Sequence, residues 1–361
     1  MSVVCEFFES IDDPRAGNSR YRLGDLLVMM VAASLCGATT ATEFSLFAQT
    51  RSAVLRKLVN YKRAPSHDTF SRLLRLLDPQ AFASVFSAFS AAFAQALKQS
   101  GISLGAEVVA IDGKALRRAY ERGLSHAPPL VVSAFAADAR LCLAAAPAGE
   151  DNEVETALRV IDLLDLTGKI VTADALHCHR RMADAVTGRK GGYVLALKAN
   201  RHDWLAEAER CFERGKGISS AASSGLAHGR SESRTAELVA AREPRMAGHA
   251  AYVRLTSIRD GEGAFTRYYM ASKGITAAQA LDIVRSHWLI ENTLHWILDV
   301  HLREDDVRAR KDNAPANIAL LKRLARNILQ TADEPKVPIS HRIKKCAWND
   351  AYLLNAVTHM R

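Results

Sequence analysis

The stretch that most constrains the fold begins near Gly101, where short apolar runs replace the helical periodicity of the preceding residues. Five of these runs have the length of strands, and they cover residues 108–111, 130–136, 141–146, 169–173 and 193–197. Helical periodicity separates the last three runs, at 153–164 and at 179–187. The order strand, strand, strand, helix, strand, helix, strand predicts a mixed sheet whose last strands are parallel and covered by helices.

The segments on either side of this sheet have other patterns. From residue 23 to about 99 the periodicity is helical, and one helix is expected to begin at Asp78 and Pro79, a typical N-cap and first position. Between 203 and 270 three further apolar runs lie among polar and Gly-rich stretches. After them, Thr276 is expected to cap a helix that runs, with a bend, toward Glu291.

At 361 residues the chain exceeds the usual length of one compact domain. We predict an α/β protein with a ribonuclease-H-like mixed sheet core, a β-rich insertion and an all-helical N-terminal module. The five predicted segments are the N-terminal module (1–100), the first part of the core (101–202), the insertion (203–270), the last core helices (271–332) and a basic C-terminal tail (333–361).

The charge of the chain favours a polyanionic partner. There are 48 Lys and Arg against 39 Asp and Glu, a formal charge of +9, and residues 51–75 contain seven basic residues and a single acidic one, Asp68. Basic clusters bind nucleic acid because phosphate contacts release condensed counterions; a solvated basic face is the alternative. The candidate DNA contacts in this segment are Arg56, Lys57, Lys62, Arg63 and Arg72.

Three observations favour the cytoplasm over a membrane or secreted location. The uncharged run 26–42 is shorter than a membrane-spanning helix and contains three threonines, so we expect a buried helix. The six cysteines form no CxxC pair, and the acidic residues near the start have the wrong charge for a secretory signal.

Three acids are candidates for a metal site. Asp112 and Asp174 each follow an apolar run directly, and if those strands are adjacent and parallel, both carboxylates reach the same sheet edge. Magnesium or manganese prefers oxygen ligands, and a third carboxylate, such as Glu291 on a crossing helix, would complete a two-metal site. Each acid has an alternative: Asp112-Gly113 is a hairpin signal, and Glu291 is four residues from His295 on a helix. Three other acids, Glu304, Asp305 and Asp306, compete with Glu291.

Several blocks resemble the bacterial insertion-sequence transposases of the H-repeat-associated, ISAs type. The core blocks are AIDGK (110–114), VSAF (132–135), NE (152–153), VTADA (171–175), LALKAN (195–200), HWLIENTLHW (287–296) and LDV (298–300). In the N-terminal module the similar blocks are IDDPR (11–15) and PSHDTF (65–70). The resemblance covers nearly the whole chain.

The resemblance implies that Asp112, Asp174 and Glu291 form a DDE triad that binds two Mg²⁺ or Mn²⁺ ions for cleavage and strand transfer of double-stranded DNA. It also implies that the N-terminal module reads terminal inverted repeats and that a homodimer brings two ends together. The chain departs from the related Tyr-Arg-Glu-Lys signature, because Val284, His287 and Leu298 occupy the other positions.

Further DNA contacts are predicted around the acids. Cations on or near the Glu291 helix would offset its negative charge, with packing or surface pairing as the alternative. The candidates are Lys114, Arg117, Lys198, Asn200, His287, His295 and Arg303. We expect His177, Cys178 and His179 to have surface or capping roles, since no ligand pair at zinc-finger spacing accompanies them.

Two other functions remain open at this point. A metal-dependent nuclease would use the same three carboxylates and a water without joining strands. A domesticated DNA-binding protein would keep the core as a scaffold and use the basic segment alone.

Overall fold

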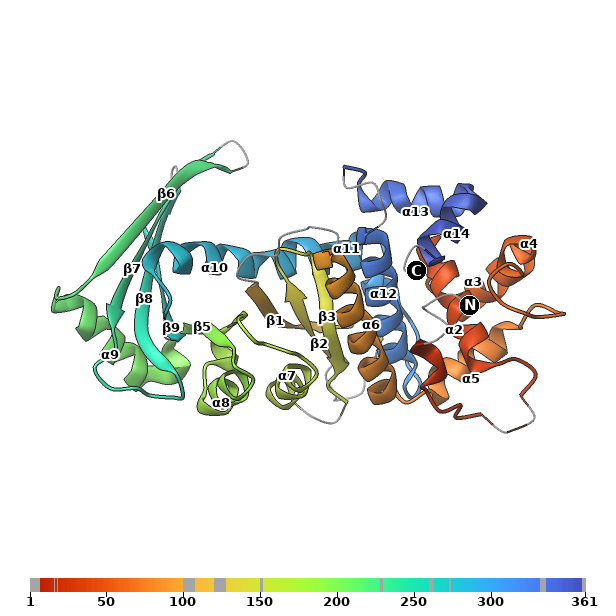
Figure 1. The fold of residues 1–361 in the computed structure, drawn as a ribbon, viewed down its shortest axis with the longest axis horizontal. Helices are drawn as coiled ribbons and strands as arrows, with labels where there is room; N and C mark the ends of the chain where they lie inside the picture. Colours follow the sequence, from red (N-terminus) through yellow and green to blue (C-terminus); the bar gives the residue numbers. More distant parts are fainter. Residues whose placement is uncertain are drawn as a thin grey trace.

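The computed structural model describes residues 7–15, 17, 19–99, 108–119, 128–149, 152–227, 230–259, 263–272, 274–331 and 336–358. Its centre is one nine-stranded sheet in the order β3-β2-β1-β4-β5-β9-β8-β7-β6 (Figure 1). The strands are β1 Val108–Ala115, β2 Leu130–Ala136, β3 Leu141–Pro147, β4 Ile170–Ala173, β5 Gly192–Leu197, β6 Ser219–Ala227, β7 Arg230–Ala240, β8 His249–Arg259 and β9 Phe265–Ser272.

The predicted order of strands and helices through residue 197 is confirmed. Strand β1 pairs in parallel with β4 and β4 with β5, while β2 and β3 join as antiparallel neighbours. Helices α7 (Glu153–Asp162) and α8 (Arg180–Gly188) form the two crossovers. The chain is therefore a mixed α/β protein with one large mixed sheet.

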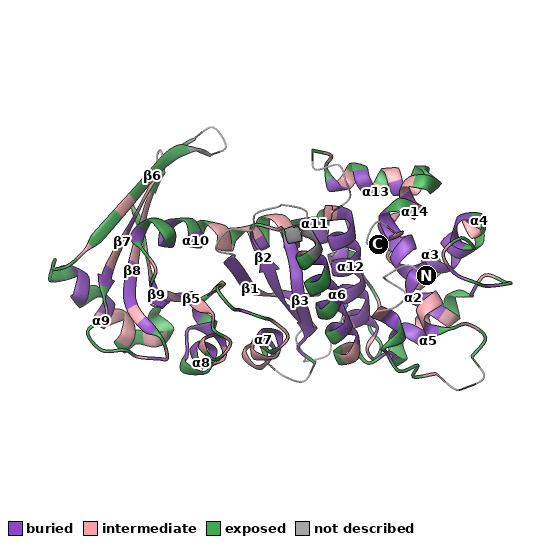
Figure 2. Ribbon diagram, viewed as in Figure 1, coloured by how far each residue is buried: buried purple, intermediate pink, exposed green. Residues whose placement is uncertain are grey.

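The β-rich segment after residue 203 extends the same sheet. Strand β9 pairs with β5, so β9, β8, β7 and β6 continue the core sheet outward. Two of its elements were missed in the sequence, α9 (His202–Glu213) and β6. The β6 sequence, SSAASSGLA, has no apolar alternation, and the strand forms by pairing along β7; Figure 2 shows it largely exposed.

Helices cover both faces of the sheet. Residues of α7, α8 and α9 share one buried cluster with Val109 and Ile111, whereas α10 (Ala277–Leu289) packs with Val108 and Val194 in another. Helix α6 (Pro79–Gln99) and helix α12 (Ala314–Thr331) lie along β3. Figure 1 shows these two helices between the sheet and the N-terminal helices.

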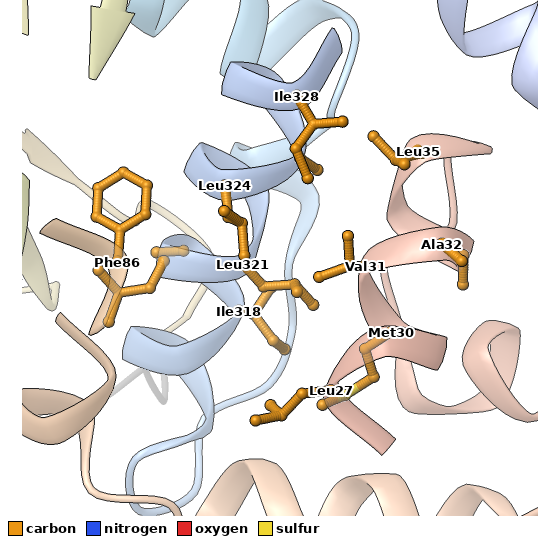
Figure 3. Packing of buried hydrophobic residues seen from close by; sticks show 14 of the residues in the cluster. Leu27, Met30, Val31, Ala32, Leu35, Phe86, Ile318, Leu321, Leu324 and Ile328 are labelled. Carbon is orange, nitrogen blue, oxygen red and sulfur yellow. The ribbon is translucent and has the colours of Figure 1, made fainter. Parts of the chain in front are cut away.

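The N-terminal helices share a core with α12. They are α2 Leu23–Leu35, α3 Ala41–Thr50, α4 Ser52–Leu55 and α5 His67–Leu76. In Figure 3, Leu27 and Val31 of α2 face Ile318 and Leu321 of α12, and all four are buried. The uncharged run forms a buried helix, as predicted, through Leu35, whereas its last residues turn into α3. No described helix is long and apolar enough to cross a membrane.

The C-terminal residues are more ordered than their sequence suggested. The predicted tail forms α13 (Ile339–Trp348) and α14 (Asp350–Thr358), which pack on α2 and α12. Arg51 forms an ion pair with Asp350 and donates to the Ala347 carbonyl, which ties α14 to the N-terminal helices. The boundaries predicted for the five segments stay a prediction.

Candidate active site

The parallel pairing of β1 with β4 sets the positions of the first two acids. In this ladder Ile111 is opposite Ala173, so Asp112, within β1, and Asp174, directly after β4, follow at neighbouring positions. Strand β1 continues to Ala115, and Asp112 pairs with Ser133 of β2. This register excludes the alternative that Asp112-Gly113 forms a hairpin turn.

Asp174 is held by the chain that follows it. Its carboxylate accepts a hydrogen bond from the Leu176 N–H (2.9 Å) and caps the 3₁₀ turn Ala175–His177. The Asp174 side chain is half exposed, so its second oxygen is open to a ligand. The capping bond fixes the direction in which this carboxylate leaves the sheet edge.

Glu291 comes from a distorted helix. Between α10 and α11 (Trp296–Val300) the residues Ile290–His295 form a π-helical segment, where the sequence had suggested a bend. Such segments occur often at functional sites, because the wider turn changes which side chains face inward. Glu291 is exposed, and His295 faces Asp112 (Nδ1 to Oδ2, 3.5 Å), so the predicted alternative of a Glu291–His295 pair is not formed.

Asp112 feels the charges of the other two predicted acids. Burial, together with the negative charges of Glu291, Glu153 and Asp174, raises the pKa of Asp112 to about 7. Like charges disfavour ionisation only when they are close. Asp112 is therefore surrounded by three other carboxylates, of which the sequence had predicted two.

The donor set suits Mg²⁺ or Mn²⁺, which prefer carboxylate oxygens. A divalent cation would relieve the repulsion that raises the pKa of Asp112. Asp112, Asp174 and Glu291 are the residues that would hold it. Among the described residues, no group of three or more His, Cys, Asp or Glu side chains is placed so that it could hold a metal ion as it stands, so the assignment of these three ligands stays a prediction.

Two histidines beside the acids are neutral at pH 7. Burial lowers the pKa of His287 to about 4, and burial together with Arg323 and Lys114 lowers that of His295 to about 3. His287 Nδ1 lies 3.0 Å from the Thr172 hydroxyl of β4. These lowered pKa values count against the expectation that the two residues supply positive charge near Glu291; their contact with DNA stays a prediction.

Lys114 is surrounded by carboxylates. Its ammonium lies 2.8 Å from Asp299, 3.0 Å from Asp305 and 3.8 Å from Glu304, and the side chain is buried. These ion pairs join β1 to α11 and to the segment that follows it, and the predicted phosphate contact of Lys114 would compete with them.

The other predicted DNA contacts differ in exposure. Arg117 and Arg303 are largely exposed, although they approach Asp305 and Asp306 at 3.6 and 3.1 Å. Lys198 is exposed just after β5, whereas the Asn200 side chain donates to the Ala175 carbonyl (2.6 Å) and supports the turn after Asp174. These contacts stay predictions.

Sequence reasoning missed the roles of two residues. Glu153, the first residue of α7, helps to raise the pKa of Asp112. The sequence did not indicate this, because acidic residues are common in the first turn of a helix. His177 is 1% exposed, so its expected surface role is wrong. The capping role expected in this segment is confirmed for His179, which accepts from the Met182 N–H.

A buried ion pair supports the site from behind. Glu304 accepts from Arg323 of α12 (2.7 Å), and Arg323 also donates to Ser133, the β2 residue opposite Asp112. Both Glu304 and Arg323 are fully buried. The three acids that were alternatives to Glu291 in the sequence thus form ion pairs elsewhere: Glu304 with Arg323, Asp305 with Lys114 and Asp306 with Arg118.

Comparison with known proteins shows the family of the chain. A family model described as "Transposase DDE domain" matches residues 103–328, and one described as "DDE_Tnp_1-associated" matches residues 5–90. The chain belongs to the DDE transposase family. It is 28% identical to "Putative transposase YncI" of Escherichia coli O157:H7, over 97% of this chain and 93% of that protein. It is 27% identical to "H repeat-associated putative transposase YhhI" of Escherichia coli K12, over 93% of this chain and 92% of that protein.

Removing Glu304 should destabilise the protein strongly. Glu304→Ala leaves Arg323 buried without its partner, which we expect to lower the free energy of unfolding by about 3–5 kcal/mol. The matched control is Asp306→Ala, because Asp306 forms only exposed ion pairs with Arg118 and Arg303. Urea unfolding followed by circular dichroism measures both; equal midpoints for the two variants would contradict a supporting role for the buried pair.

Proposed function

We propose that the chain cleaves DNA at the ends of an insertion sequence and joins the freed strands to target DNA, using Asp112, Asp174 and Glu291. The observation that carries the proposal is the β1–β4 register, which supports a shared edge for two carboxylates, together with the effect of Glu291 on Asp112. We further propose that β1 to β5 with α7 and α8 form a ribonuclease-H-like core.

The roles of the residues follow from their environments. The three carboxylates would hold two divalent ions, which would supply Lewis acidity to the attacking and leaving oxygens during phosphodiester cleavage. The neutral imidazoles of His287 and His295 can each donate one N–H hydrogen bond to a phosphate oxygen without adding charge. Asp112, whose pKa lies near 7, needs a cation or a proton to be stable in its buried position.

The exposed positive charge of the N-terminal module supports DNA binding there. Of its seven basic residues between 51 and 75, Arg51 and Arg75 pair with Asp350 and Asp312. The remaining five, Arg56, Lys57, Lys62, Arg63 and Arg72, are exposed and form no ion pair within the described residues. Arg20, Tyr21 and Arg63 line both of two adjoining grooves of about 820 and 980 Å³. We infer that this surface contacts the terminal inverted repeats, and that two copies of the chain bring two ends together.

A strand-transfer assay on DNA that carries the cognate ends, with Mg²⁺, tests the triad. We expect Asp112→Asn, Asp174→Asn and Glu291→Gln each to reduce joined product by at least about 10²-fold, because each removes a charge that would bind the ions. Asp282→Asn is the control, since this acid is exposed on the same helix as Glu291.

The same assay separates the alternatives. Cleavage without joined product in the wild type would favour the nuclease. Full joining activity in any of the three triad variants would exclude that residue from the site, and activity in all three would favour a protein whose core is a scaffold.

Salt dependence tests the N-terminal surface. If Arg63 neutralises one phosphate, Arg63→Ala should lower the slope of log K against log salt by about 0.9 for duplex DNA. Arg75→Ala is the matched control, because its guanidinium is already paired with Asp312 (2.6 Å). Fluorescence anisotropy from 50 to 300 mM KCl gives both slopes; an unchanged slope for Arg63→Ala would place the DNA elsewhere.

A further inference from the structure

We propose that Glu153 is a fourth carboxylate of the metal site and that His177 is the positioning residue that holds it there. This inference rests on the proposed function, because it adds a ligand to the site formed by Asp112, Asp174 and Glu291. It is carried by the contact of Glu153 with β1 and by the burial of His177.

Glu153 reaches the strand that carries Asp112. Helix α7 begins at Glu153 after its N-cap Asn152, which orients the first turn toward β1. A Cβ atom placed on Gly113 would lie 2.5 Å from Glu153 Oε1 and 2.7 Å from its Cδ. The Glu153 carboxylate thus rests on the backbone of Gly113, next to Asp112, in space that only glycine leaves open.

Glu155, the other glutamate in the first turn of α7, provides a comparison for Glu153. Glu155 is exposed and forms a bidentate ion pair with Arg181 (2.5 and 2.7 Å). The Glu153 side chain is 27% exposed, and within the described residues no Lys or Arg pairs with it. A partly buried carboxylate beside Asp112, Asp174 and Glu291 lacks a countercharge that a divalent cation would supply.

His177 is the second, independent sign of a ligand site. Its side chain is 1% exposed, and in the described part of the chain neither ring nitrogen has a hydrogen-bond partner. Nε2 points between two carboxylates, 3.5 Å from Glu153 Oε1 and 4.0 Å from Asp174 Oδ1. Unpaired buried nitrogens are costly, and metal-binding carboxylates are typically held by such outer hydrogen bonds. A small movement of Glu153 would form that bond.

Manganese binding tests the proposal without DNA or catalysis. We expect Glu153→Gln in the full chain to weaken Mn²⁺ binding about 10- to 100-fold, measured by calorimetry and by the electron paramagnetic resonance signal of free Mn²⁺. Glu155→Gln, two residues further along the same turn, should bind Mn²⁺ as the wild type does.

Two more variants separate positioning from folding. Gly113→Ala should also weaken Mn²⁺ binding, because the added methyl group displaces the Glu153 carboxylate. In the double variant with Glu153→Gln, it should not lower the Mn²⁺ affinity any further. His177→Gln keeps a donor near Nε2 and should retain more affinity than His177→Leu. Thermal unfolding by circular dichroism identifies any variant that lost its fold.

The outcomes separate this inference from the proposed function. If folded Glu153→Gln binds Mn²⁺ as tightly as the wild type while Asp112→Asn binds it more weakly, Glu153 is not a ligand and the metal site of the triad stands. Wild-type affinity in both variants would overturn the metal site itself. Equal affinity in His177→Gln and His177→Leu would overturn the positioning role of His177.

Discussion

The parallel pairing of β1 with β4 is the constraint on which the site depends. Because Ile111 and Ala173 share a register position, the next residue of each strand is an aspartate at the same sheet edge. Neither strand could shift by one residue without moving its buried side chains to the opposite face. The apolar residues of β1 and β4 therefore fix the distance between two carboxylates that repel each other.

The structure tolerates the repulsion among the carboxylates because contacts on both sides of the site fix the elements that carry them. Behind β1 and β2, Arg323 of α12 binds both Glu304 and Ser133, so a helix shared with the N-terminal core fixes the position of the strand pair that carries Asp112. On the open side, the π-helical segment presents Glu291 between neutral His287 and His295. The negative charge is thus concentrated where a cation and a phosphate would bind.

Much of this could be predicted from the sequence, for physical reasons. Short apolar runs identify buried strands, and their order implied the parallel neighbours, so Asp112 and Asp174 followed from local pattern. Glu291 required the family resemblance, because only the fold shows that Glu304 is buried against Arg323 and that Asp305 binds Lys114. The burial of His177, the neutral state of His295 and the contact of Glu153 with Gly113 depend on tertiary packing, which no local pattern encodes. Likewise β6 is a strand because β7 pairs with it.

Anomalous X-ray diffraction from crystals grown with Mn²⁺ tests the central claim most directly, since it locates the ions independently of activity. The account predicts anomalous peaks at the sheet edge, within ligand distance of Asp112 and Asp174 and with Glu291 beside them. Saturating Mn²⁺ with no peak at this edge, or with peaks only at acids outside it such as Asp305 and Asp306, would contradict the claim.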